Sequence, residues 1–206
     1  TCERIYFGLQ PANEKRKGSD YTVFMVIGLG EDENFYVINM IRDRLSLTER
    51  ANVMFQLPRD FRPEIVGYEK YGKDADIEHF LDRMERENYR FSISELGGQM
   101  GKNDRIRRLV PLFEASRIYL PDYCNRRNYE GVYEDLTKVF LNDEFLAFPV
   151  GAHDDMMDCL SRICDDAVPK LWPEREVVGL PPYMVGSMQH ITTPKQLTEW
   201  DPYGGE

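Results

Sequence analysis

The sequence predicts an α/β fold with a mixed β-sheet, in which an antiparallel meander of three strands is joined by parallel strands and flanked by helices. Two observations support this. Three stretches rich in apolar, β-branched and aromatic residues, at 4–9, 20–28 and 35–41, are joined by short polar segments, which is typical of a meander. Helices and short strands then alternate along the chain, as expected when helices cover the faces of a sheet.

The elements after the meander follow from apolar spacing and from end signals. Residues 46–49 (Ser-Leu-Thr-Glu) resemble a capping box, and the apolar positions behind them predict a helix that stops near Pro58. A fourth strand is expected at 64–69, an amphipathic helix over 74–89 and a fifth strand at 91–95.

The second half of the chain continues this alternation. Helical spacing returns over 106–113, a short strand is expected at 117–121, and a further helix is expected over 129–141. An apolar run at 145–149 then leads into a last helix, whose apolar positions continue to Val168.

Length and composition bound the class of protein. The 206 residues, 42% of them hydrophobic, suit one domain with a substantial core. Prolines interrupt the chain beyond Val168, so residues 1–168 are expected to form the domain and 169–206 an extended or partly disordered C-terminal tail. No apolar run is long enough to cross a bilayer, so no membrane partner is expected.

Charge and cysteine usage narrow the class further. The net charge of −10 argues against a general polyanion binder, although a local basic strip can still act near a cleft. The four cysteines have no metal-finger spacing and are interpreted as reduced thiols in a cytosolic setting: Cys2, Cys124, Cys159 and Cys164.

The last predicted helix opens with an acidic segment. Asp154 and Asp158 are an i,i+4 pair and Asp155 and Asp158 an i,i+3 pair, so these carboxylates crowd one side of the helix. A divalent cation held by hard oxygen ligands would neutralise them. Acidic residues in a first helical turn are also favoured by the helix dipole and the free N–H groups there, so capping is an equal alternative for this segment alone.

A strand end supplies a further acidic group. Glu69 ends the fourth strand, and Gln10 takes the corresponding place after the first strand. Two divalent ions about 3.5–4 Å apart can activate a water and stabilise the leaving oxygen of a phosphodiester. Mg²⁺ and Mn²⁺ prefer oxygen ligands, so Glu69 and the aspartates of the last helix are candidate ligands.

Taken in order, short motifs along the chain resemble the nuclease domain of the large terminase subunit of tailed bacteriophages. The resemblance runs from about Tyr6 to Ala167. The motifs are Gly-Leu-Gln-Pro-Ala at 8–12, Ser-Asp-Tyr-Thr at 19–22, Val-Gly-Tyr-Glu at 66–69, Lys102 with Arg105 and Ile106, Arg-Ile-Tyr-Leu-Pro at 117–121, and Glu-Phe-Leu-Ala-Phe-Pro at 144–149 leading into His-Asp-Asp at 153–155.

The resemblance implies a ribonuclease-H-like fold and a metal-dependent endonuclease that cuts concatemeric double-stranded DNA, using two Mg²⁺ or Mn²⁺ ions. It implies Glu69 and Asp155 as catalytic ligands, with Asp154 or Asp158 completing a second metal's shell. Gln10 stands where the family usually has Asp. It is an engineered knock-out, a natural loss of activity, or a site where Asp20 compensates. His153 and Asp20 are expected in support.

Basic groups are candidates for contacts with DNA phosphates, with solvated faces as the alternative for each. They are Lys15, Arg16, Lys17, Lys102, Arg105, Arg107, Arg108, Arg126 and Arg127. Lys102 and Arg105 stand out because they lie within a matched motif.

The resemblance also implies partners and a setting. It places a packaging ATPase in an N-terminal domain absent from this chain, and it implies a small terminase subunit and a portal protein as partners, in the cytoplasm of the host cell. Two alternatives remain: a catalytically silent module that binds DNA or the portal, and a recombinase- or resolvase-type nuclease acting on branched DNA.

Overall fold

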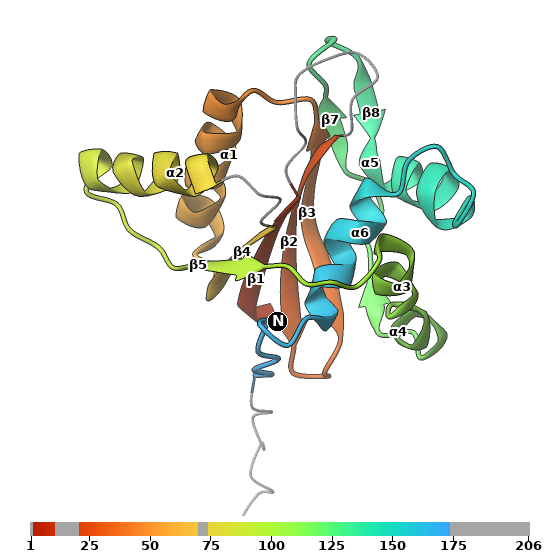
Figure 1. The fold of residues 1–206 in the computed structure, drawn as a ribbon. Coiled ribbons are helices and arrows are strands. Elements are labelled where there is room, and N and C mark those ends of the chain that lie inside the picture. Colours follow the sequence, from red (N-terminus) through yellow and green to blue (C-terminus); the bar gives the residue numbers. More distant parts are fainter. Residues whose placement is uncertain (1, 11–20, 70–73, 174–206) are drawn as a thin grey trace, which may run out of the picture. The chain divides into compact units, whose positions relative to one another are not determined.

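Figure 1 shows the computed structural model, which describes residues 2–10, 21–69 and 74–173, with side chains described for 21–69 and 76–173. Six strands of this part form one sheet in the order β5-β4-β1-β2-β3-β6. Their bounds are β1 Cys2–Gln10, β2 Thr22–Gly30, β3 Phe35–Asp43, β4 Ile65–Glu69, β5 Ile93–Leu96 and β6 Ile118–Tyr119.

The pairing of these strands confirms the expected mixed sheet. β2 is antiparallel to both β1 and β3, which makes the meander. β4 is parallel to β1, β5 is parallel to β4, and β6 is parallel to β3. All nine residues of β2 are buried, as expected for a central strand whose two faces are both covered.

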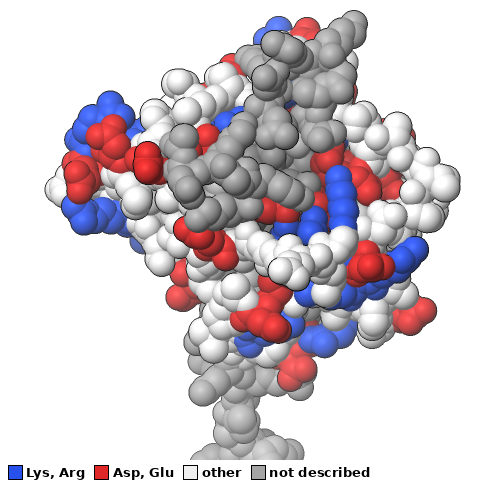
Figure 2. Space-filling model, in the orientation of Figure 1, with Lys and Arg blue, Asp and Glu red and all other residues white. Residues whose placement is uncertain are grey.

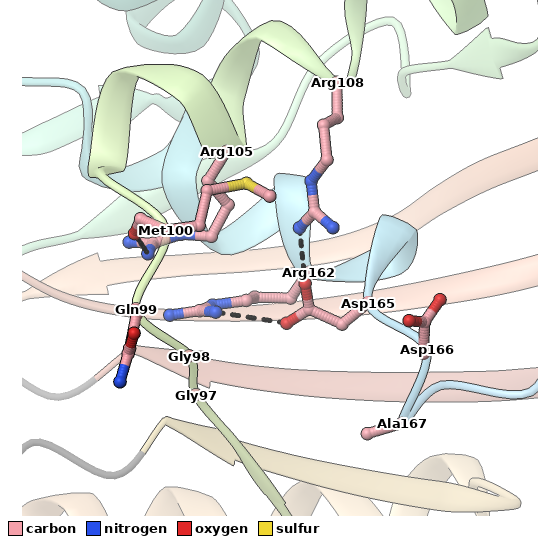
Figure 3. Close-up of a pocket in the computed structure, with 10 residues that line it drawn as sticks. All are labelled: Gly97, Gly98, Gln99, Met100, Arg105, Arg108, Arg162, Asp165, Asp166 and Ala167. Carbon is pink, nitrogen blue, oxygen red and sulfur yellow. Dashed lines mark hydrogen bonds and ion pairs between the residues drawn. The ribbon is translucent and has the colours of Figure 1, made fainter.

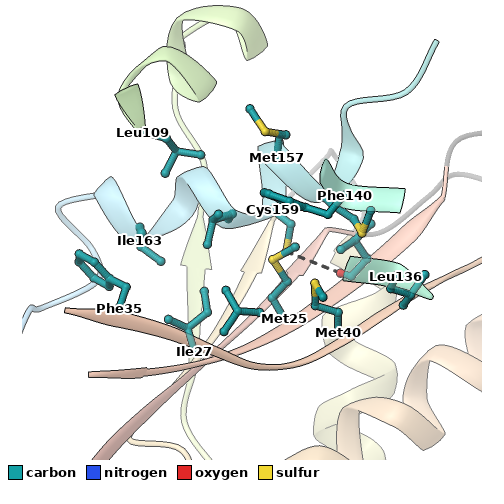
Figure 4. Packing of buried hydrophobic residues seen from close by; sticks show 14 of the residues in the cluster. Met25, Ile27, Phe35, Met40, Leu109, Leu136, Phe140, Met157, Cys159 and Ile163 are labelled. Atoms are coloured by element: carbon teal, nitrogen blue, oxygen red, sulfur yellow. Dashed lines mark hydrogen bonds between the residues drawn. The ribbon is translucent and has the colours of Figure 1, made fainter. Parts of the chain in front are cut away.

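Alternation along β2 divides the apolar core into two clusters. Met25 and Ile27 face a cluster that includes Met156 and Leu160, under the helices of the second half of the chain (Figure 4). Phe24 faces the opposite cluster, with residues of the first two helices.

The helices lie on both sides of this sheet (Figure 1). On one side are α1 and α2, and on the other are α3 to α6. Their bounds are α1 Leu47–Phe61, α2 Asp74–Glu87, α3 Lys102–Arg107, α4 Val110–Glu114, α5 Leu136–Val139 and α6 Asp155–Ser161, with a π-helical turn at Phe140–Phe145 and a 3-10 turn at Arg162–Cys164.

The expected capping box of α1 is present. Ser46 Oγ accepts a hydrogen bond from the Glu49 N–H, and Glu49 accepts one from the Ser46 N–H. The expected stop near Pro58 is wrong, because the helix continues to Phe61. Proline removes one N–H from the ladder but keeps its carbonyl, which accepts a hydrogen bond from the N–H of the left-handed C-cap Arg62.

The helix expected over 129–141 is wrong for its first half, which belongs to a hairpin of β7 Asn125–Arg127 and β8 Tyr133–Asp135. The turn between the strands explains the difference. Gly131 has φ +85°, a conformation that favours glycine, and the Asn128 side chain accepts hydrogen bonds from the Glu130 and Val132 N–H groups. Local turn chemistry thus prevails over apolar spacing.

The expected helix over 106–113 is two short helices. Pro111 lies in the first turn of α4, where its missing N–H removes no intrahelical bond.

At the other end of the described chain, the Trp172 ring packs edge-on against Phe35, with 5.0 Å between ring centroids. Of the expected tail, 169–206, residues 169–173 are described and form no helix or strand, and residues 174–206 lie outside the described residues. In the described part, no helix is both long and apolar enough to span a bilayer.

Candidate active site

The register of the parallel pair β1 and β4 brings the two expected strand-end residues to one edge of the sheet. Leu9 pairs with Tyr68, so Gln10 and Glu69 are the next residues on neighbouring strands. Glu69 is 2% exposed. The side chains of Gln10, Lys15, Arg16, Lys17 and Asp20 lie outside the described residues.

The N-terminus of α6 is held by a residue twelve positions earlier. Glu144 Oε2 accepts hydrogen bonds from the N–H groups of Met156 and Met157 at 2.8 and 3.0 Å. Asp154, at the N-cap position, makes no side-chain cap hydrogen bond. Side-chain capping by the acidic segment is therefore wrong, because another carboxylate takes the first-turn N–H groups. Asp155 and Asp158 still lie in the first turn, where the helix dipole favours acidic residues.

Burial on one side of α6 gathers the acidic residues toward the strand ends. α6 packs against β1, β2 and α3, and it buries Asp155 and Asp158 almost completely. Burying an ionised carboxylate is costly unless a positive partner compensates it. The positively charged partners of each carboxylate therefore show how its charge is balanced in this site.

Two of the acidic residues, Glu69 and Asp158, are paired with arginines, and we call them the inner carboxylates. Arg105 grips Asp158 with two hydrogen bonds, Nε to Oδ1 at 2.6 Å and Nη2 to Oδ2 at 2.7 Å. Its Nη2 also lies 3.5 Å from Glu69 Oε1. Arg162 Nη2 forms a close ion pair with the same Glu69 oxygen. Guanidinium groups thus balance this buried pair from two sides.

The other two, Asp154 and Asp155, share one lysine, and we call them the outer carboxylates. Lys102 Nζ lies 2.6 Å from Asp154 Oδ1 and 3.0 Å from Asp155 Oδ1. On the other side of Asp155, Oδ2 accepts a hydrogen bond from the Tyr21 N–H at 3.4 Å, and His153 Nδ1 lies 3.8 Å away. His153 therefore lies beside Asp155, as expected.

Glu144 carries the described carboxyl group whose pKa is raised most clearly. Burial raises the pKa of Glu144 to about 7, against the lowering effect of the Met157 N–H and of Arg42, whose Nε lies 3.5 Å from Oε1. Arg42 stacks over the Tyr21 ring, with its guanidinium carbon 3.6 Å from the ring centroid. Glu144, which Arg42 accompanies, therefore contacts the first turn of α6 at the two residues that follow Asp155.

A pocket of about 360 Å³ is lined in part by the two arginines that pair with the inner carboxylates (Figure 3). Arg105, Arg108 and Arg162 line one part of it, and Asp165 accepts hydrogen bonds from both Arg108 and Arg162. The arginines are largely neutralised by these acids. This balance gives the pocket little attraction for an anion.

The basic residues expected to contact DNA have different surroundings. Arg105 is buried and committed to Asp158, whereas Arg107 is exposed and pairs with Asp104 at 2.9 Å. Arg126 hydrogen-bonds the Met40 carbonyl at 3.3 Å. Figure 2 shows acidic and basic side chains gathered together over α3 and α6. A DNA contact remains a prediction for each of them, and the geometry gives Arg105 an internal structural role.

The carboxylate oxygens of the site are the kind of ligand that a hard divalent cation prefers. The described side chains do not by themselves surround a cation completely. Among the described residues, no three His, Cys, Asp or Glu side chains are grouped closely enough to hold a metal ion. Mg²⁺ is usually held by one or two carboxylates together with waters and substrate phosphates. Asp154 and Asp155 already converge on one positive charge. Glu69 Oε2 is buried without a hydrogen-bond partner among the described residues.

The sequence did not single out two residues that contact the candidate site, Glu144 and Arg162. Glu144 is the first residue of one of the matched motifs, at 144–149. The motif marked its position, but nothing in the sequence indicated that it would bind the first turn of α6. Arg162 reaches Glu69 from more than ninety residues away along the chain. Apolar spacing around α6 gives no sign of that pairing.

The mixed sheet, in the order β5-β4-β1-β2-β3-β6 with helices on both faces, confirms the α/β fold class expected from the sequence. No family model and no curated protein sequence matches the chain. Solved structures do match.

The nuclease domain of the human cytomegalovirus terminase is similar at 14% identity, with 80% of this chain and 85% of that chain covered and a TM-score of 0.56. A manganese-soaked structure of that domain matches at 13% identity, with 81% and 85% covered and a TM-score of 0.52. The large terminase nuclease of the thermophilic phage G20c, with bound magnesium, gives 16% identity, 77% and 79% coverage and a TM-score of 0.48. At these identities the likeness is one of fold, and the two cytomegalovirus structures confirm the expected resemblance at that level.

Proposed function

We propose that this chain is the nuclease domain of a viral DNA-packaging terminase, a metal-dependent endonuclease that cuts concatemeric double-stranded DNA. The observation that carries the proposal is that buried carboxylates from the end of β4 and from α6, Glu69 and Asp158, share Arg105, while the buried Asp155 of α6 pairs with Lys102 of the same helix α3. The shared fold with the cytomegalovirus terminase nuclease domain supports it.

In this proposal, Glu69 and Asp155 are the catalytic carboxylates, and Mg²⁺ or Mn²⁺ is the cofactor. Asp154 and Asp155 would hold one ion. A second would need Glu69 together with groups near Gln10 and Asp20. A bound ion supplies an activated water and stabilises the leaving oxygen of the phosphodiester. Asp158 would serve as a ligand only if Arg105 released it, because both of its oxygens are now engaged.

The chain's own residues contribute orientation and charge balance. Glu144 fixes the first turn of α6, so that Asp155 is directed toward the strand ends. His153 and the Tyr21 N–H lie on the far side of Asp155 and limit its rotation. The proposed partners are double-stranded DNA, a packaging ATPase domain, a small terminase subunit and a portal protein, in the cytoplasm of the host cell.

Gln10 favours one second candidate, a catalytically silent module that binds DNA or the portal. It is the residue after Leu9, beside Glu69 at the sheet edge. A neutral amide there brings no charge and binds hard cations less strongly than a carboxylate does. A loss of turnover with retained DNA binding would follow.

Plasmid cleavage separates the two candidates. Supercoiled plasmid is incubated in Mn²⁺ with the wild-type chain, Gln10→Asp and Asp155→Ala, with Asp82→Ala as a control for loss of an exposed helical carboxylate. Cutting by the wild type and the control, but not by Asp155→Ala, supports the nuclease. Cutting by Gln10→Asp alone identifies a disabled nuclease. No cutting by any variant, with no Mn²⁺ binding in calorimetry, would refute the proposal.

A further inference from the structure

The cation shared by the outer carboxylates differs in kind from the cations of the inner pair. Arg105 is fixed at several points, since its Nη1 also donates to the Met100 carbonyl at 3.2 Å. Arg162 is buried and also pairs with Asp165 at 3.1 Å. Lys102, by contrast, has a side chain that is 35% exposed, and it reaches its two partners from the first residue of α3.

The chemistry of the two side chains makes this difference matter. A guanidinium bound through two parallel hydrogen bonds is held rigidly, whereas an ammonium is a compact charge on a flexible four-carbon stem. Lys102 can therefore move away by rotating its own side chain into solvent. Arg105 and Arg162 are buried, so they could move away from the inner carboxylates only if the residues packed around them also moved.

Lys102 already supplies a positive charge to both outer carboxylates. Its ammonium lies within salt-bridge distance of Asp154 Oδ1 and of Asp155 Oδ1, so it balances their charge without a metal ion.

We propose that Lys102 is an exchangeable internal counter-cation, which occupies the cation position between Asp154 and Asp155 and is displaced when a divalent metal ion binds there. The inference rests on the proposed function, because it concerns the metal site of the same nuclease. It goes further by assigning Lys102 a role in controlling metal occupancy. Without metal, Lys102 keeps the outer carboxylates together; with metal, it swings toward solvent.

The exchange predicts a competition that calorimetry measures directly. Mn²⁺ is titrated into the full chain, into Lys102→Met, which keeps a long side chain without charge, and into Lys138→Met as the control. Lys138 is 75% exposed and pairs with one carboxylate, Asp135. With the competing charge removed, Lys102→Met should bind Mn²⁺ about tenfold more tightly. Lys138→Met should match the wild type.

A second measurement needs no variant and so does not depend on Lys102→Met folding. The wild-type chain is labelled with an amine-reactive acetylating reagent with and without Mn²⁺, and labelling at each lysine is read by peptide mass spectrometry. Labelling of Lys102 should rise severalfold on addition of Mn²⁺, because an ammonium held between two carboxylates reacts slowly. Labelling of Lys138 should not change.

The outcomes separate this inference from the proposed function. Equal or weaker Mn²⁺ binding by Lys102→Met, or unchanged labelling of Lys102 when Mn²⁺ binds, would overturn the exchange and leave a metal-dependent nuclease intact. If neither the wild type nor Lys102→Met binds Mn²⁺, the metal site itself is wrong and both proposals fall.

Discussion

The inner and outer carboxylates lie side by side at one edge of the sheet, yet their charges are balanced in opposite ways. Glu69 and Asp158 are almost fully buried and paired with Arg105 and Arg162. Asp154 and Asp155 share the half-buried Lys102. The first arrangement is closed, with short hydrogen bonds on both oxygens of Asp158. The second is open toward solvent at Lys102.

This difference separates what holds the fold from what binds a ligand. A buried ion pair adds little net stability, but removing one partner leaves an uncompensated charge and is strongly destabilising. The Arg105–Asp158 pair should therefore behave as structure, since it ties α3 to α6. The outer pair can exchange its cation without disturbing packing, and so it should behave as a binding site.

Breaking the inner pair should have the largest effect. Arg105→Met removes the bidentate partner of Asp158 and a charge near Glu69 while keeping a long apolar stem. The free energy of unfolding should fall by about 3–5 kcal/mol, measured by urea denaturation at neutral pH. Arg107→Met removes an exposed arginine of the same helix and should change it by less than about 0.5 kcal/mol. Similar losses for both variants would contradict a structural role for the inner pair.

Glu144, which supports α6 behind the outer pair, should give the second largest effect through pH. Its pKa is raised from 4.5 to about 7 in the folded protein, so folding favours the protonated form. The stabilisation is complete below about pH 4.5 and is lost as pH rises through 7. The gap between 4.5 and about 7 corresponds to roughly 3 kcal/mol.

Glu144→Gln tests this linkage. The amide stays neutral and keeps an oxygen to accept hydrogen bonds from the Met156 and Met157 N–H groups. The decrease in unfolding free energy between pH 5 and pH 8 should shrink by roughly 3 kcal/mol, measured by urea denaturation at each pH. Glu114→Gln, at the exposed end of α4, should keep the wild-type dependence. An unchanged profile in Glu144→Gln would show that another group titrates.

The elements that surround the site could be predicted because their signals are local. The three strands of the meander and the strand that ends at Glu69 each show an apolar run closed by polar residues. The aspartates of α6 stand out by their spacing. A local pattern misleads where it is compatible with two kinds of secondary structure. Around Gly131 the apolar spacing suggested a helix, and the chain forms a β-hairpin.

The partners within the site could not be predicted, because they depend on packing between distant segments. Arg105 and Asp158 are 53 residues apart, and only the docking of α3 on α6 brings them together. The sequence made Arg105 a candidate for DNA phosphate contact, and a buried guanidinium and an exposed one look alike in sequence. Glu144 presents the same difficulty, since an acidic residue carries no sign of which N–H groups it will meet.

Metal addition should distinguish the two pairs directly. Mn²⁺ at about a hundred times its dissociation constant should stabilise the wild-type chain by roughly 2.7 kcal/mol, an effect that EDTA reverses. Asp155→Asn should lose most of this gain, because it removes charge from the outer pair. Asp158→Asn should be less stable from the start but should keep the gain. The measurement is thermal unfolding with and without Mn²⁺. If only Asp158→Asn lost the stabilisation by Mn²⁺, Asp158 would be the metal ligand and Asp155 would not.

The smallest effect should come from the opposite side of the sheet, where a stability change is expected to leave metal binding alone. Ser46→Ala removes the N-cap of α1, whose hydroxyl accepts the Glu49 N–H, and should cost about 1 kcal/mol. The increase in stability on adding Mn²⁺ should equal that of the wild type, since α1 contributes no carboxylate to either pair. Thermal unfolding with and without Mn²⁺ checks both values. If Ser46→Ala also lost the increase, metal binding would respond to stability in general, and the separation between the inner and outer carboxylates would not hold.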